Sequence, residues 1–418
     1  MVNPRKRPLG TAVVACTAML GFLAGACGND EADPAAGDAT STTEVEGGAL
    51  WNGPMPNTQA MTPEDAGAID DEAAEIISQA DGQVPGMWFG VWDAEKGKHL
   101  GAYGNAVVGG AGAATDQIGR IGSVTTTFTA AAMLQQVSEG WASLDDTIED
   151  LLPDLAEKYP DVAGITVEQL IGMTSGIPDY ANSDWFLPQV AEDPSRVWEP
   201  AEIIDQVLSR GDLEPIGTPG YSTTNYLILG EMLEEVVEGD EDISEILDGV
   251  AEDAGLAGAR MPEPDDASLP DPHSNGYVSE VGAESLAPTG ATIAPGTDVT
   301  DWSPSWGGAG GAMYAGVEDL GAWAGTGLGT ALLSQETGDL RISETSELPE
   351  EGTYGLGLLE LGDGWIGHTG QIVGWEALAA YNTDTGDVFV AIVNEAGSLT
   401  AAVAVAVEVY PELGEALI

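Results

Sequence analysis

A serine at the start of a predicted helix is the residue in this chain best placed to do chemistry. Ser123 lies in the segment Arg120-Ile121-Gly122-Ser123-Val124-Thr125-Thr126, and apolar residues follow it at helical spacing as far as Val137. Residues three apart on a helix lie on one face, so we expect the Thr126 side chain beside the Ser123 hydroxyl. A serine hydroxyl is a poor nucleophile until a neighbouring group takes its proton. Thr126 cannot do this, because its hydroxyl is short, uncharged and not basic near neutral pH.

Four further segments combine polar side chains with glycines in patterns that could line a site. They are Leu170–Pro178, Gly220–Tyr226, Gly310–Gly311 and His368–Gly370. Each has a purely structural explanation when it is taken alone. A serine at a helix start usually caps the helix, Tyr221 could be a core residue, and His-Thr-Gly occurs by chance.

The order of these five segments resembles that of the serine β-lactamase and D,D-carboxypeptidase family, which includes class C β-lactamases, penicillin-binding-protein-like peptidases and related esterases. The serine segment resembles the Ser-x-x-Lys motif, and Tyr221-Ser222-Thr223 resembles the Tyr-x-Asn motif. His368-Thr369-Gly370 resembles the Lys/His-Thr-Gly edge strand that lines the substrate slot. Leu170–Pro178 resembles the family's Leu-x-x-His-Thr-Ser-Gly-Leu-Pro loop. The resemblance extends from about Met87 to Asn394.

This resemblance implies the roles of particular residues. Ser123, Tyr221 and His368 stand at catalytic positions, and the residues expected to bind substrate are Thr369, Gly370 and Asn225. It implies no cofactor and no metal. The ligand it implies is a peptidoglycan peptide or an acyl-type small molecule.

Two positions depart from the family pattern where the proton chemistry is expected. Thr126 replaces the lysine that takes the serine proton together with the tyrosine, and Thr223 replaces the asparagine. Tyr221 would then need another cation to lower its pKa from about 10, and only His368 could supply one. The lysines beyond the leader, Lys96, Lys98 and Lys158, lie in no motif. We therefore expect little or no turnover.

Three functions remain open from the sequence. The first is a surface pseudoenzyme that binds cell-wall peptide or a protein partner in or around the former acyl-substrate slot. The second is an active serine hydrolase, namely a D,D-carboxypeptidase, a β-lactamase or an esterase, in which Tyr221 and His368 activate Ser123. The third is a non-catalytic acidic scaffold for interactions.

The N-terminus has the pattern of an export leader. Arg5, Lys6 and Arg7 precede an apolar stretch, and Ala24-Gly25-Ala26-Cys27 resembles a lipobox whose cysteine is lipidated. We predict a lipoprotein signal peptide over residues 1–26, a disordered tether over 27–62 and a β-lactamase-like domain over 63–418. An ordinary secretory leader or an uncleaved anchor is the alternative. The protein is then extracytoplasmic, with its lipid anchor at Cys27 as the one contact with the cell membrane.

The composition excludes some partners. The formal net charge is −59, and all 70 acidic residues follow Cys27, so the domain repels polyphosphates and nucleic acid is excluded as a partner. Calcium sites are not predicted either, because no loop of the Asp-x-Asp-x-Asp-Gly type occurs. The two cysteines, Cys16 and Cys27, lie in or at the end of the leader, so the domain is expected to hold no disulfide.

The elements expected from the pattern give an α/β fold of the α+β sandwich type. Thr62-Pro63 begins a capped helix that extends to about Gln79, and Met87–Tyr103 forms a hairpin. Two more strands are expected over 376–381 and 387–394, and a closing helix over 400–409. Since strands at both ends of the chain must share one antiparallel sheet, with helices on both faces, we predict a single domain.

Overall fold

The computed structural model describes residues 7–8, 49–80, 83–239, 241–349, 352–396 and 400–417. Cys27 and the predicted tether up to residue 48 lie outside the described residues. No helix within the described ranges is both long enough and apolar enough to cross a membrane.

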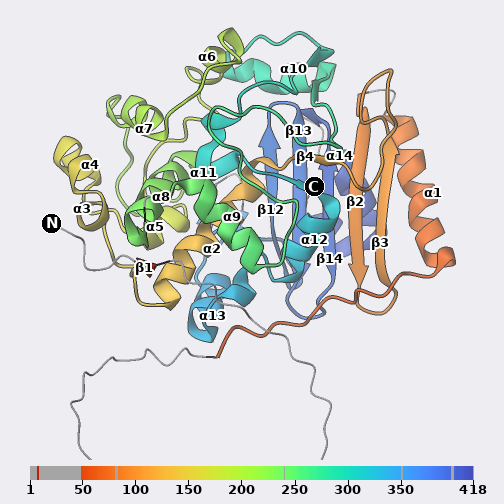
Figure 1. Cartoon of the computed structure of the whole chain (residues 1–418), viewed down its shortest axis with the longest axis horizontal. Helices are drawn as coiled ribbons and strands as arrows, with labels where there is room; N and C mark the ends of the chain where they lie inside the picture. Colours follow the sequence, from red (N-terminus) through yellow and green to blue (C-terminus); the bar gives the residue numbers. More distant parts are fainter. Residues whose placement is uncertain are drawn as a thin grey trace, which may run out of the picture.

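An antiparallel sheet of eight strands joins the two ends of the chain (Figure 1). Its strand order is β3-β2-β14-β13-β12-β11-β10-β9. The strands, taken in that order, are Gly97–Gly104, Gly86–Asp93, Val388–Val393, Trp375–Asn382, Trp365–Ile372, Leu359–Glu360, Gly352–Tyr354 and Ser346–Leu348. The predicted hairpin is β2 and β3, and β2 pairs with β14 through Val91 and Phe389. The predicted sheet built from distant segments is therefore confirmed.

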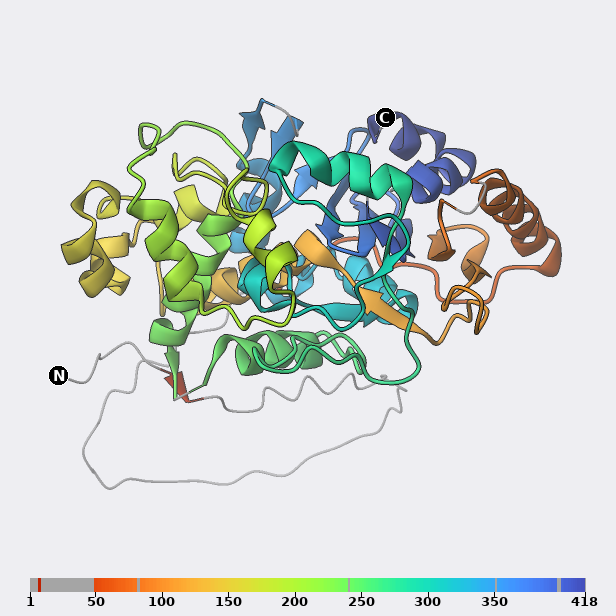
Figure 2. The same ribbon diagram turned by 90° about the horizontal axis from the view of Figure 1, so that it is seen from above.

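Helices cover both faces of this sheet, as expected. The helices α1 (Pro63–Gln79) and α14 (Thr400–Val409) pack together on one face, and α12 (Val317–Gly325) packs on the other (Figures 1 and 2). The close approach of α12 depends on Gly321, because a Cβ there would lie 1.8 Å from the Trp92 ring. The strands β13 and β14 are buried along their whole length, which explains why they are nearly continuous apolar runs.

The remaining helices gather on the α12 side of the sheet, around α2 (Thr125–Ser138) (Figure 2). They are α3 (Ile148–Leu151), α4 (Pro153–Lys158), α5 (Val167–Ile171), α6 (Leu187–Glu192), α7 (Pro200–Leu208), α8 (Thr223–Val236), α9 (Ile243–Asp253), α10 (Glu280–Leu286), α11 (Gly308–Gly311) and α13 (Gln335–Ser343). The short helix α15 (Pro411–Ala416) follows α14. Single 3-10 turns are η1 (Gly122–Val124), η2 (Pro160–Val162), η3 (Ala287–Thr289), η4 (Ser305–Gly307) and η5 (Thr330–Leu332).

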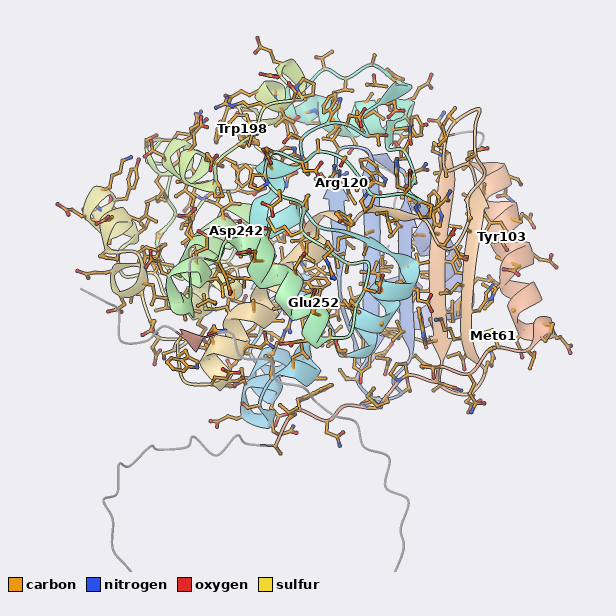
Figure 3. The ribbon with its side chains drawn as sticks, in the orientation of Figure 1. Met61, Tyr103, Arg120, Trp198, Asp242 and Glu252 are labelled. Carbon is orange, nitrogen blue, oxygen red and sulfur yellow. The ribbon has the colours of Figure 1, made fainter. Side chains whose placement is uncertain are left out.

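Short strand pairs tie this helical region together. They are β4 (Ile118–Arg120) with β8 (Tyr314–Gly316), β6 (Tyr277–Val278) with β7 (Thr297–Asp298) and β15 (Glu395–Ala396), and β1 (Arg7–Pro8) with β5 (Val237–Glu238). Figure 3 shows Arg120, at the end of β4, between the sheet and the helices. This strand leads directly into the turn that carries Ser123.

Local sequence features account for the ends of the predicted helices. The Thr62 hydroxyl accepts a hydrogen bond from the Asp65 backbone N–H at 3.2 Å, so α1 begins with the expected cap. The helix α8 ends at Val236, three residues before Gly239, whose φ is +136°. It begins at Thr223, within the motif that also contains Tyr221.

The segment from Ala49 to Thr62 differs from the prediction, which assigned it to the tether. Its chain packs on the domain, where the Trp51 N–H donates to the Leu333 carbonyl at 3.0 Å and the Tyr381 hydroxyl donates to the Pro54 carbonyl at 2.7 Å. Met61 is buried next to the start of α1 (Figure 3). The composition is polar, but Trp51 and Met61 pack on the domain, whereas Leu50 and Met55 remain exposed.

Candidate active site

Ser123 lies in the 3-10 turn η1, between β4 and α2, where the backbone of β12 comes very close. Gly122 has a φ of +50°, and a Cβ on it would lie 2.5 Å from the Gln371 nitrogen. A Cβ on Gly370 would lie 1.9 Å from the Ile121 carbonyl oxygen. The two glycines therefore let β12 lie directly against the serine turn. This contact places Ser123 at the boundary of sheet and helices, as predicted.

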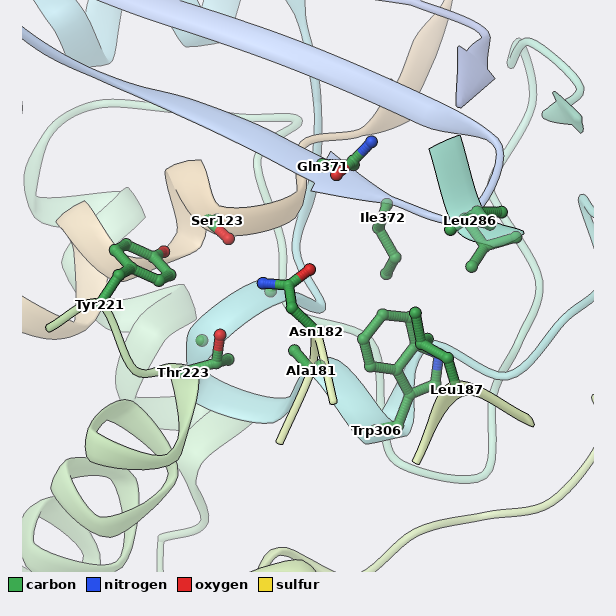
Figure 4. Close-up of a pocket in the computed structure, with 14 residues that line it drawn as sticks. Ser123, Ala181, Asn182, Leu187, Tyr221, Thr223, Leu286, Trp306, Gln371 and Ile372 are labelled. Atoms are coloured by element: carbon green, nitrogen blue, oxygen red, sulfur yellow. The ribbon is translucent and has the colours of Figure 1, made fainter. Parts of the chain in front are cut away.

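The Ser123 side chain faces a small pocket that opens to solvent (Figure 4). One end of it is polar, and the other is formed by Trp306 and aliphatic side chains. The lining residues are Ser123, Ala181, Asn182, Leu187, Tyr221, Thr223, Leu286, Trp306, Gly307, Gly310, Gly311, Gln371, Ile372 and Val373. The structure thus brings the serine, tyrosine and Gly-Gly segments of the sequence to one cavity.

Thr126 is held inside its own helix. Its hydroxyl donates a hydrogen bond of 2.7 Å to the Ser123 carbonyl oxygen, and the side chain is fully buried. The hydroxyl of Tyr354, a residue of β10, lies close to it. A threonine that bonds back to the preceding turn satisfies its hydroxyl locally. Position 126 therefore offers the serine no proton acceptor.

The lysines beyond the predicted leader are engaged outside the pocket. Lys98 pairs with Glu318 at 2.5 Å, Lys158 pairs with Asp205, and Lys96 lies 3.5 Å from Asp93. None of the three lines the pocket. No lysine of the described chain therefore takes the place of the one that Thr126 replaces.

His368 is buried next to the pocket and keeps a neutral imidazole. Its Nδ1 donates to the Thr369 carbonyl at 2.5 Å, so Nε2 accepts the hydrogen bond of 3.1 Å from the Tyr354 hydroxyl. Burial lowers the pKa of His368 to about 4. A neutral imidazole supplies no cation to Tyr221, although the two rings lie only 6.1 Å apart.

The three residues expected to bind substrate have other surroundings. Asn225 is fully buried, where its amide donates to the Leu170 carbonyl at 3.1 Å and accepts from the Ser175 hydroxyl at 2.7 Å. These hydrogen bonds join Asn225 to the loop before α6, and Asn225 does not line the pocket. Its assignment as a substrate-binding residue is therefore wrong. Thr369 is likewise outside the lining, and Gly370 acts through the close approach described above.

Three residues of the site were not predicted. Asn182 and Gln371 line the pocket, and Tyr354 contacts both Thr126 and His368. The sequence offered one sign of Asn182. Asp179, three residues before it, is of a residue type that favours turns, so a loop could be expected there. The Asp179 carboxylate accepts from the Asn182 amide at 2.8 Å and from the Thr223 N–H at 2.9 Å. No pattern near Tyr354 indicates a site.

No group of three or more possible metal ligands occurs among the residues described.

We expect an NMR titration of His368 to show an imidazole that stays neutral down to about pH 4. Because the unfolded chain takes up this proton near pH 6.5, the contribution of His368 to stability is complete above pH 6.5. It is lost as the pH falls to about 4. The resonance is assigned by comparison with His368→Asn. A titration midpoint of His368 close to pH 6.5 would contradict the buried neutral imidazole. It would again allow a cation beside Tyr221.

A model of the beta-lactamase family matches residues 69–409 of the chain. Among curated proteins, penicillin-binding protein 4 of Amycolatopsis lactamdurans is 32% identical over 127 residues, which cover 30% of this chain and 31% of that protein. The chain spans less than a third of the length of the curated relatives that it matches.

Solved structures match over most of the chain. A D-stereospecific amidohydrolase from Streptomyces sp. is 27% identical with a TM-score of 0.67, covering 82% of this chain and 98% of that one. D-amino acid amidase from Ochrobactrum anthropi SV3 has a TM-score of 0.70 at 21% identity, again covering 82% and 98%. At 21% identity, the similarity to the amidase shows a shared fold alone.

Proposed function

This chain belongs to the beta-lactamase family, and we propose that it is an exported, lipid-anchored member whose Ser123 pocket binds an acyl compound or a cell-wall peptide with little or no turnover. The observation that carries the proposal is the hydrogen bond from Thr126 to the Ser123 carbonyl, because position 126 then offers the serine no base. Proton transfer by a positioned base contributes roughly 10²- to 10⁴-fold to the rate of such reactions. Losing it leaves the pocket better suited to binding than to catalysis.

The names of the similar proteins favour an acyl or amide ligand. One relative is a penicillin-binding protein, and two similar structures are an amidohydrolase and an amidase that are named for D-stereospecific or D-amino acid substrates. The pocket retains the features that such a ligand needs, namely a serine at its polar end and an aromatic wall formed by Trp306. We infer that the ligand is of this class.

An active hydrolase remains the second candidate, because Ser123 and Tyr221 line the same pocket. Labelling with a fluorescent penicillin and with a fluorophosphonate separates the two. We expect neither reagent to label the protein above the level of Ser123→Ala, because position 126 offers the serine hydroxyl no proton acceptor. Intact-mass spectrometry checks the result. Stoichiometric label on the parent protein that Ser123→Ala abolishes would show that catalysis is retained.

The lipid anchor is proposed from the leader alone. We expect Cys27→Ala to release the protein into the medium or to leave an unprocessed precursor, because the thiol of Cys27 would carry the lipid. Cys16→Ala is the matched control and should change neither processing nor location. Metabolic labelling with an alkyne fatty acid measures this directly, and label that survives Cys27→Ala would refute the proposal.

A further inference from the structure

The lining of the Ser123 pocket carries no charged side chain. Among the residues that the structure describes around it, the polar ones are Ser123, Asn182, Tyr221, Thr223 and Gln371. The other lining residues are glycine or apolar, and Trp306 forms a wall with Leu187, Leu286, Ile372 and Val373 (Figure 4). A carboxylate in this pocket would lose water without meeting a cation, which is unfavourable.

The basic residues that flank the serine turn and β12 have partners outside the pocket. Arg120 donates to the Ala267 carbonyl at 2.6 Å, and its guanidinium faces the Trp375 ring at 5.8 Å. Arg341 is fully buried and donates to the carbonyls of Leu356 and Thr127. His368 is neutral, as shown above. None of the three lines the pocket.

The negative charge around the pocket acts in the same direction. The Asp179 carboxylate accepts hydrogen bonds from two pocket residues, the Asn182 amide and the Thr223 backbone N–H. The whole chain has a formal net charge of −59. Anions are therefore repelled both locally and over the Debye length of about 8 Å at physiological ionic strength.

Asn182 provides a hydrogen-bond acceptor for an uncharged ligand. Its Nδ2 donates to Asp179 at 2.8 Å, which fixes the orientation of the carboxamide. Figure 4 shows the side chain between Ser123 and Trp306, with its oxygen on the side of Gln371 and Ile372. This oxygen can accept from the N–H of an amide, while the Trp306 end receives an apolar group.

We propose that the Ser123 pocket selects uncharged amides of apolar acyl or amino-acid groups and rejects the corresponding free carboxylates. The proposal rests on the binding function proposed above and names its ligand class. It excludes peptides that would have to place a terminal carboxylate in this pocket. Asn182 is then the specificity-determining residue for the amide, and the uncharged lining is what discriminates against the acid.

A matched pair of ligands tests the selectivity. N-acetyl-D-phenylalaninamide and N-acetyl-D-phenylalanine differ only in an amide against a carboxylate, and isothermal titration calorimetry with the full chain gives both dissociation constants. We expect the amide to bind at least 10-fold more tightly, in 0.15 M and in 1 M sodium chloride alike. Molar salt reduces the Debye length to about 3 Å, so a preference that persists there comes from the pocket.

Two substitutions locate the effect. Ala181→Lys adds a cation to the lining and should raise affinity for the carboxylate about 10-fold, whereas Ala181→Met, of similar length and uncharged, should not. Asn182→Leu should weaken binding of the amide about 10-fold. Unchanged amide affinity in Asn182→Leu would overturn the role given to Asn182.

The outcomes separate this proposal from the one on which it rests. Equal or tighter binding of the carboxylate, or a preference that disappears in molar salt, would overturn the selectivity while ligand binding in the pocket stands. Binding of neither compound would overturn the binding function itself and the selectivity with it.

Discussion

Thr126→Lys combined with Thr223→Asn is expected to make Ser123 hydrolyse a p-nitrophenyl ester, where the parent protein gives almost no reaction. A lysine on the face that Ser123 occupies would provide the missing proton acceptor, and its positive charge would lower the pKa of Tyr221. Thr223 lines the pocket, so an asparagine there would present its amide to the ligand. We expect a gain of roughly 10²- to 10⁴-fold in the rate of ester hydrolysis.

The structure adds a steric condition to this experiment. The Tyr354 hydroxyl lies close to Thr126, where a longer side chain at position 126 would need space. Adding Tyr354→Phe removes that hydroxyl and keeps the ring, so the triple variant should be at least as active as the double one. Initial rates and acyl-enzyme masses measure the gain, and Ser123→Ala in either background must abolish it. If both variants remain inactive, changes at positions other than 126 and 223 also prevent catalysis.

The sequence predicted best those elements of the fold that depend on residues close together in the chain. The cap at Thr62 and the alternation in Met87–Tyr103 are visible within a few residues, and the structure has α1, β2 and β3 there. The pairing of β2 with β14 follows once both ends of the chain are recognised as strands. The segment 49–62 was missed because its packing depends on single side chains such as Trp51, which carry no periodicity.

The site was predicted only in part, because its electrostatics come from contacts between distant segments. Ser123, Tyr221 and Thr223 could be found from motifs, and they line one pocket. The neutral state of His368 follows from burial and from Tyr354 on another strand, which no local pattern shows. Asn225 was misassigned for the same reason, since its partners Leu170 and Ser175 belong to a loop that only the fold brings near.

The contact between β12 and the serine turn should make Gly370 one of the least replaceable residues near the site. A Cβ on Gly370 would lie 1.9 Å from the Ile121 carbonyl oxygen and 2.9 Å from the Val124 nitrogen. Both of these atoms belong to backbone, which cannot rotate away, so Gly370→Ala must push β12 from η1. Overpacking of this kind costs about 1–3 kcal/mol. We expect a lower melting temperature together with weaker ligand binding, because the same shift moves Ser123 against Gln371.

Gly67→Ala is the matched control, because Gly67 lies within α1 and a Cβ there meets no atom within 4 Å. Alanine is the better helix former by up to about 1 kcal/mol, so this variant should be at least as stable as the parent and should bind ligand equally well. Thermal unfolding and calorimetric titration of both variants make the comparison. The two substitutions add the same single methyl group. Any difference between the variants in melting temperature or affinity therefore arises from the surroundings of each glycine. If Gly370→Ala matched Gly67→Ala in melting temperature and affinity, the serine turn would not depend on backbone contact with β12.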